Sequence, residues 1–239
     1  MMHNINLKFV AYDVGDKQLI VMNDMEWMQR NWVQGHYYEE LLLEYIKDNY
    51  KGDTFVDVGA CIGNHSVFFS SIADDVVSFE PLKENFYHLT LNLKLNGIKN
   101  VDFYNFGLGY KEELTTLWYD SAQKNSGNST MEGKLPETDS ARFVPVIQMD
   151  SLEINNVKLI KIDVEGYEVE VLKGAIKTIE MFHPDMFIEC STQAEYDKVF
   201  AFLKPLGYLK PDLVFNGTPT YLFSTEPKEL FSKKKEVAK

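Results

Sequence analysis

Cysteine and long apolar runs are both scarce in this chain. It has two cysteines among 239 residues, Cys61 and Cys190, and they form neither a CxxC pair nor a zinc-ligand spacing. We therefore expect two reduced, buried thiols and no disulfide framework. No apolar run is long enough to cross a bilayer, and no charged-then-apolar leader opens the sequence. These absences predict a cytoplasmic protein without a membrane span.

Basic residues are also in short supply. The chain has 24 lysines and arginines against 36 aspartates and glutamates, which gives a formal net charge of −12 at pH 7. A protein that holds nucleic acid through its phosphates needs a basic face. Residues 233–235 are consecutive lysines, and we interpret them as a solvated tail rather than a phosphate patch. We expect no nucleic-acid partner.

What the chain does contain is a regular alternation of strand and helix patterns. Its composition, 45% hydrophobic and 25% charged, is typical of a globular domain. Strand–helix alternation predicts an α/β fold in which helices cover both faces of a parallel sheet. Two C-terminal runs joined by Asn216-Gly217 predict an antiparallel hairpin at the end of the sheet. The predicted strands are residues 54–58, 76–80, 101–106, 158–163, 186–190, 208–215 and 220–223.

Helical spacing accounts for the segments between the strands. Apolar residues recur at this spacing after Tyr38, in residues 86–97 and in residues 169–179. A capping box formed by Thr192 and Glu195 predicts where a further helix begins. Near the N-terminus, alternation around Gly15-Asp16 predicts a β-hairpin.

One interval interrupts the rhythm. Strand-like residues 114–119 and 143–148 flank a polar stretch, and we expect residues 120–141 to form a mobile loop that covers the ligand site. The predicted organisation has three parts: an N-terminal β-hairpin extension (1–34), a main domain (35–225) and a basic C-terminal tail (226–239).

The segment FVDVGACIGNHSVFF, residues 55–69, carries the first functional signal. Asp57, Gly59 and Gly63 lie where a buried strand gives way to a helix, so the turn can approach a ligand closely. The middle glycine of the dinucleotide motif GxGxxG is missing, and so is the P-loop lysine. Glu80 ends the next strand, where a carboxylate can bond both ribose hydroxyls. A ribose contact without a pyrophosphate cradle favours S-adenosylmethionine over NAD; the alternative is that Glu80 merely caps the helix after Pro81.

Four stretches together resemble the FkbM-type family of S-adenosylmethionine-dependent methyltransferases. They are FVDVGACIGNHS, SFEP, LIKIDVEGYEVEVLKGA and PDMFIEC, and the resemblance runs from about Gly35 to Phe223. It implies a Rossmann-like class I methyltransferase fold, with a mostly parallel seven-stranded sheet and a C-terminal antiparallel hairpin. One departure is Cys61, where the family usually has asparagine, so one polar contact near the cofactor is in question.

The resemblance also implies roles for individual residues. The catalytic candidates are Asp163, Glu165, His65 and Glu189. The cofactor-binding candidates are Glu39, Asp57, Gly59, Ala60, Gly63, Asn64, Glu80, Pro81, Asn105 and Asp163. Three of these keep a second interpretation: His65 as a polar residue at a helix start, Glu165 as a partner of the helix dipole, and Glu189 as the partner of a lysine.

The predicted activity is methyl transfer from S-adenosylmethionine to a hydroxyl of a sugar, glycan or natural product, and the hydroxyl preference comes from the resemblance. Two alternatives stay open: an N-methyltransferase, and a non-catalytic domain that only binds the cofactor. The spacing of histidines and acidic residues indicates no metal site, and nothing in the sequence indicates an oligomeric state.

Overall fold

The computed structural model describes residues 9–15, 17–22, 29–119, 127, 129–133 and 140–229. Most of the loop predicted at 120–141 and the lysines at 233–235 lie outside the described residues. The expected mobility of that loop and the three-part division of the chain therefore stay predictions.

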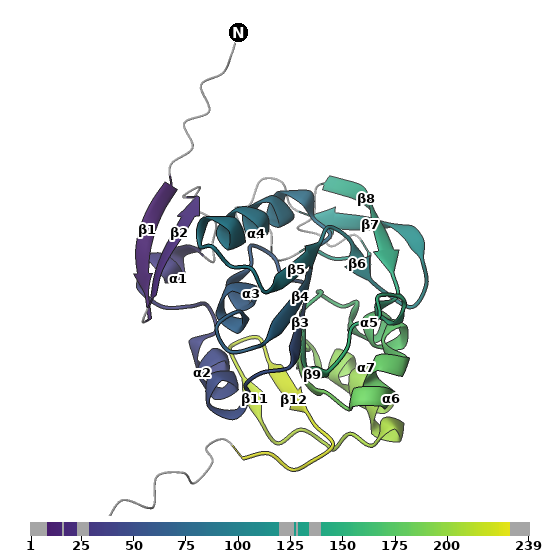
Figure 1. Ribbon diagram of the computed structural model, residues 1–239. Coiled ribbons are helices and arrows are strands. Elements are labelled where there is room, and N and C mark those ends of the chain that lie inside the picture. The colour runs from purple at the N-terminus through teal and green to yellow at the C-terminus, as the bar shows by residue number, and fades with distance from the viewer. Residues whose placement is uncertain are drawn as a thin grey trace, which may run out of the picture.

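A seven-stranded sheet in the order β11-β12-β10-β9-β3-β4-β5 forms the centre of the molecule (Figure 1). Five strands are parallel, β12 runs antiparallel to β10, and β11 runs antiparallel to β12. This arrangement confirms the predicted fold class. The strands are β3 (Thr54–Val58), β4 (Asp75–Phe79), β5 (Val101–Tyr104), β9 (Val157–Ile162), β10 (Asp185–Glu189), β11 (Val214–Phe215) and β12 (Thr220–Phe223).

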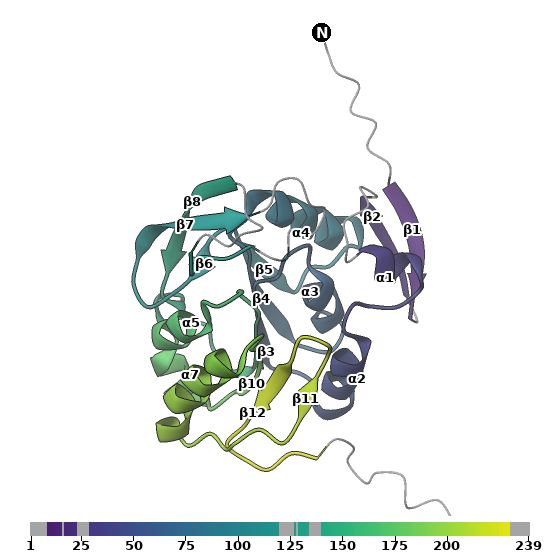
Figure 2. The same ribbon diagram turned by 180° about the vertical axis from the view of Figure 1, so that it is seen from behind.

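Helices cover both faces of this sheet, as Figures 1 and 2 show. One face carries α2 (Glu40–Asn49), α3 (Asn64–Phe69) and α4 (Lys83–Leu95); the other carries α5 (Glu168–Gly174), α6 (Ile176–Phe182) and α7 (Gln193–Leu203). Side chains alternate along each strand, so Phe55 and Leu159 join the first core while Val56 and Ile160 join the second. Burial on both faces explains why the strands are apolar runs without polar alternation.

The predicted helix at 169–179 is instead two helices, α5 and α6, which meet at Ala175. Ala175 has a non-helical backbone (φ −114°, ψ 13°). Asp150 then accepts hydrogen bonds from the backbone N–H groups of Lys177 and Thr178, which cap a new helix start. The cap comes from a residue distant in sequence, so local spacing did not indicate the break.

Two further predictions concern the chain's C-terminal third. The capping box is confirmed: Thr192 Oγ1 accepts from the Glu195 N–H, and Glu195 accepts from the Thr192 N–H. The strand predicted at 208–215 is wrong over most of its length, because only Val214–Phe215 pairs with a neighbour. Pro211 lacks the N–H that a ladder needs, which favours an irregular approach to the sheet.

Smaller elements flank the sheet. β1 (Phe9–Val14) and β2 (Lys17–Met22) form the predicted hairpin, followed by α1 (Gln29–Val33). The side chain of Asn96 in the turn after α4 bonds both backbone groups of Ile20, which ties the hairpin to the domain. A second sheet in the order β6-β8-β7 contains β6 (Gly107–Leu108), β7 (Glu113–Tyr119) and β8 (Ser140–Ile147). The described ranges also include the short 3-10 helices η2 (Met149–Ser151) and η3 (Lys204–Leu206).

Both cysteines are buried and free, as predicted. In the described ranges, no helix combines the length and the hydrophobicity needed to cross a membrane.

Candidate active site

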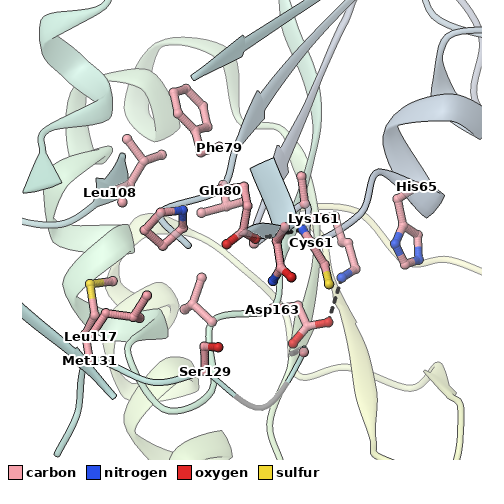
Figure 3. Close-up of a pocket in the computed structure, with 18 of the residues that line it drawn as sticks. Cys61, His65, Phe79, Glu80, Leu108, Leu117, Ser129, Met131, Lys161 and Asp163 are labelled. Carbon is pink, nitrogen blue, oxygen red and sulfur yellow. Dashed lines mark hydrogen bonds and ion pairs between the residues drawn. The ribbon is translucent and has the colours of Figure 1, made fainter. Parts of the chain in front are cut away.

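A pocket of about 720 Å³, partly open to solvent, lies at the carboxyl edge of the central sheet (Figure 3). The chain places β4 and β5 on one side of β3 and later returns to place β9 and β10 on the other side. The carboxyl ends of β3 and β9 thus form a switch point, where α/β sheets bind ligands. The lining residues are Tyr38, Val58, Gly59, Ala60, Cys61, His65, Phe79, Glu80, Pro81, Asn85, Gly107, Leu108, Leu117, Gly127, Ser129, Met131, Lys161, Asp163 and Val164.

Gly59 allows the two central strands to end in contact. Its φ is +84°, and a Cβ built on it would lie 1.8 Å from the backbone oxygen of Asp163. The Asp163 N–H donates to the Val58 carbonyl at 3.0 Å across the same junction. Only glycine fits this approach, because any side chain would overlap backbone atoms of the neighbouring strand.

One end of the pocket is apolar. Phe79 comes from the end of β4, Leu108 from β6 and Leu117 from β7, and Met131 lies beside them (Figure 3). The small sheet therefore supplies part of the wall of a site that the large sheet opens.

The carboxylate of Glu80 lies next to this apolar end and is fully buried. Its two oxygens accept hydrogen bonds from the backbone N–H groups of Cys61 and Leu82, both at 2.8 Å. Burial raises the pKa of Glu80 to about 7 because it outweighs these hydrogen bonds and one from Asn85. Asn105 does not line the pocket; its amide donates to the Glu80 and Pro81 carbonyls and braces this turn.

Two of the predicted cofactor residues are buried beneath the pocket. Asp57 is completely buried and accepts a 2.6 Å hydrogen bond from the Ser66 hydroxyl, which links β3 to α3. Asn64 bonds the indole N–H of Trp32 and both backbone groups of Tyr38. Asp57 and Asn64 thus support the segments that line the pocket without lining it themselves. Gly63 also lies outside the lining, and it precedes α3 with a φ of +91°.

His65 and Glu39 form a buried pair at the opposite end of the pocket from Phe79. His65 Nε2 lies 2.8 Å from Glu39 Oε2, and the two side chains are 6% and 3% exposed. The oxygen lies off the line of a proton on Nε2, so the contact is a close electrostatic one rather than a linear hydrogen bond. The other oxygen, Oε1, accepts a 2.6 Å hydrogen bond from the amide of Asn216, between β11 and β12.

Lys161 is a buried cation in the pocket wall. Its ammonium lies 2.8 Å from Asp163 Oδ2, and its side chain is 2% exposed (Figure 3). Burial lowers the pKa of Lys161, but the carboxylates of Asp163, Glu39 and Asp57 outweigh burial and hold the pKa above its usual value. Lysine is therefore charged here, which is possible only because several acids surround it.

Asp163, Glu165 and Glu189 form a carboxylate cluster beside Lys161. One oxygen from each lies within 4.8 Å of the others, close enough to share a cation. Burial and the charge of Asp163 raise the pKa of Glu165 to about 7 and that of Glu189 to about 9. Three carboxylates lie near one ammonium group, so Glu165 and Glu189 hold their protons to a higher pH than isolated carboxyl groups do.

The structure thus brings Gly59, Ala60, His65, Glu80, Pro81 and Asp163 into the pocket lining and leaves Glu39, Asp57, Gly63, Asn64, Asn105, Glu165 and Glu189 behind or beside it. Sequence reasoning missed Lys161, Tyr38 and Asn216. A lysine inside the apolar strand LIKI was a usable signal for Lys161, because a charge in a buried strand needs partners. Nothing local linked Asn216 to residues near the N-terminus.

Comparisons with known proteins agree with this geometry. Residues 57–210 match the family model of the methyltransferase FkbM domain. A hexuronic acid methyltransferase, AglP of Haloferax volcanii, is 30% identical over 145 residues, which are 59% of this chain and 56% of the relative. The matched region is thus little more than half of that relative.

A solved structure supports the fold. The crystal structure of methyltransferase FkbM from Methylobacillus flagellatus superposes with a TM-score of 0.54 at 18% identity and covers 72% of this chain and 43% of the other. The family model spans the glycine turn, Glu80, the Lys161–Asp163 pair and Glu189. The chain belongs to the FkbM methyltransferase family.

Proposed function

We propose that this chain transfers a methyl group from S-adenosylmethionine to an oxygen atom of a sugar, glycan or related natural product. The observation that carries the proposal is the order of groups along one pocket. An apolar end is followed by a buried carboxylate, Glu80, and then by an acidic end at Asp163. Adenine, ribose and a positively charged sulfonium follow one another in the same order.

The residues present fit this cofactor. Phe79, Leu108 and Met131 offer apolar surface to an adenine ring. Glu80 uses its carboxylate for two backbone N–H groups and the Asn85 side chain, and a carboxylate has about four acceptor positions, so one position is left for a ribose hydroxyl. Asp163 and its neighbouring acids attract a cation. When bound, the cofactor supplies an electrophilic methyl group.

The protein's contribution to the chemistry is alignment and proton handling. Holding an acceptor in line with the methyl group can contribute about 7–11 kcal/mol through proximity and orientation. A hydroxyl acceptor also needs a group that removes its proton. His65 and Asp163 line the end of the pocket where this would occur, and Glu165 and Glu189 lie beside it.

The choice of an oxygen acceptor rests on family membership and on the similarity to a hexuronic acid methyltransferase. The direct test is transfer of tritiated methyl from S-adenosylmethionine to three matched probes: p-nitrophenyl β-D-glucuronide, p-nitrophenyl β-D-glucoside and p-nitrophenyl β-D-glucosaminide. We expect label on a glycoside oxygen of the first or second. Label only on the amine of the third would favour N-methylation, and cofactor binding without any transfer would favour a binding domain.

A further inference from the structure

We propose that His65 is the general base of the transfer, that Glu39 orients its ring, and that Asn216 fixes Glu39 from the C-terminal hairpin. This inference rests on the proposed function, because it assigns the proton-accepting group of the same site. It selects His65 from the four catalytic candidates that the sequence offers, which also include Asp163, Glu165 and Glu189. The arrangement is a carboxylate, an imidazole and a pocket in sequence, which is how proteins commonly prepare a histidine base.

Glu39 is a charged neighbour of the imidazole ring. Burial raises the pKa of this carboxyl group, but His65 and Lys161 outweigh burial, so the net pKa is lowered. Glu39 is therefore ionised at neutral pH. An ionised oxygen 2.8 Å from Nε2 favours the tautomer in which Nε2 carries the proton.

The other ring nitrogen of His65 is Nδ1. With the proton on Nε2, Nδ1 of the neutral ring is an acceptor. Throughout the part of the chain that the structure describes, no hydrogen bond engages Nδ1, and His65 lines the pocket. His65 thus has one ring nitrogen beside an ionised carboxylate and, among the described residues, a second ring nitrogen without a hydrogen bond, in a side chain that lines the pocket.

The three acids near His65 are less suited to accept the proton. Asp163 is tied to the buried ammonium of Lys161 at 2.8 Å, so its charge already has a partner. Glu189 lies outside the pocket lining, and burial together with the charge of Asp163 raises its pKa to about 9, so it is a poor acceptor for the proton. Glu165 lies outside the lining, close to Asp163.

Asn216 holds the Glu39 side chain in place. Its amide donates to Glu39 Oε1 at 2.6 Å and to the Thr220 hydroxyl at 3.1 Å. Asn216 has a φ of +67° in the hairpin turn, a conformation that asparagine tolerates well. Asn216 is thus a positioning residue, acting through Glu39 on the tautomer of His65.

In the step itself, the acceptor oxygen forms a bond to the methyl carbon while its proton passes to Nδ1. The methyl–sulfur bond breaks, and its electron pair stays on the sulfur. The imidazolium that results lies against the Glu39 carboxylate, which stabilises its charge. The proton then leaves to solvent, and the ring returns to its starting tautomer.

The first test needs no acceptor. Long-range proton–nitrogen NMR spectra of labelled protein report the tautomer of each neutral histidine, and His65→Gln identifies the signal of His65. We expect Nε2–H and bare Nδ1 for His65, and a mixture of tautomers in Glu39→Gln and Asn216→Gly. Glycine at 216 accepts the positive φ and removes only the amide. His183→Gln is the matched control and should leave the His65 signal unchanged. An Nδ1–H tautomer for His65 would overturn the proposal.

The second test separates catalysis from folding and binding. With p-nitrophenyl β-D-glucoside as acceptor, whose sugar offers hydroxyl groups and no carboxylate, His65→Gln should lower kcat by about 10²–10⁴-fold. Affinity for S-adenosylhomocysteine, measured by calorimetry, should stay unchanged, and added imidazole should restore part of the rate of His65→Ala. The pH profile of kcat also contains contributions from Glu39, Tyr38, Lys161 and Asp163, because these titratable or charged groups share this end of the site. Unchanged kcat in His65→Gln would refute the proposal. Absence of transfer by the wild type, with the expected tautomer present, would instead count against the proposed function.

Discussion

The hydrogen bonds that each side chain makes within the protein determine what it can offer a ligand at this site. Glu80 is typical: both of its oxygens bond backbone N–H groups, so the residue holds the glycine turn and the start of the next segment together. A carboxylate that organises backbone in this way is also pre-positioned for a ligand, since its orientation is fixed before binding. Helix capping and ligand binding are therefore compatible roles for Glu80.

Glu80→Gln tests the ligand role at nearly constant side-chain size, while its NH2 group replaces one of the two oxygens that accept from backbone N–H groups. We expect the variant to fold and to lose at least about tenfold in affinity for S-adenosylmethionine, because a charged acceptor's hydrogen bonds are worth about 1.5–3 kcal/mol each. Isothermal calorimetry measures the affinity, and thermal unfolding checks the fold. Unchanged affinity would leave Glu80 with the structural role alone.

At the residue scale, the sequence predicted the participants better than their contacts. Asp57, Glu80, Asp163 and Glu189 all lie at or near carboxyl ends of strands, as the apolar runs before them indicate. Their partners were not readable, because hydrogen bonds such as that between Glu39 and Asn216 join residues 177 positions apart. Local patterns carry no information about such pairs.

At the scale of elements, the fold depends on close backbone approaches. Gly174 at the end of α5 is the clearest after Gly59: a Cβ on it would lie 1.9 Å from the backbone oxygen of Gly109. This contact packs α5 against Gly109, the residue after β6. β6 itself supplies part of the pocket wall. The five parallel strands, β12 and α4 were predicted to within a few residues because periodicity is local. The break between α5 and α6 depends instead on Asp150 from another part of the fold.

Gly174→Ala should therefore lower the free energy of unfolding by about 1–3 kcal/mol or more, since backbone atoms have to move to admit the methyl group. The control is Gly217→Ala, where a Cβ meets nothing within 4 Å. We expect that control to stay within about 0.5 kcal/mol of the wild type. Urea unfolding of both variants measures the difference, and equal stability of the two would show that α5 can shift without cost.

At the scale of the whole molecule, acidic groups dominate. The net charge is −12, and the site adds buried acids whose pKa values are raised by burial: about 7 for Glu80, Glu165 and Glu168, and about 9 for Glu189. Lys161 balances only part of this charge. A cationic ligand at this place would relieve the remainder, so electrostatics and the proposed cofactor are consistent.

The raised pKa values of these buried acids predict a pH dependence of the free energy of unfolding. A carboxyl group with a raised pKa binds more protons in the folded than in the unfolded state between its ordinary value, 4.5, and its folded value. Stability therefore falls as pH rises through this window, up to about 9 for Glu189. Glu39 has the opposite sign, but its lowered pKa places its change below the window.

Thermal unfolding across this pH range measures the slope. The variant Glu189→Gln removes the group with the highest raised pKa, so the decline should become shallower on the alkaline side. Stability that increases steadily from about pH 6 to 9 would contradict the account of these acids.

The central claim is that this pocket binds S-adenosylmethionine, and calorimetry of the purified chain with S-adenosylmethionine, S-adenosylhomocysteine and NAD tests it most directly. The account predicts binding of the first two at a single site and much weaker or no binding of NAD, because the glycine turn lacks the middle glycine of a pyrophosphate cradle. Tighter binding of NAD, or no binding of either adenosyl ligand, would contradict it.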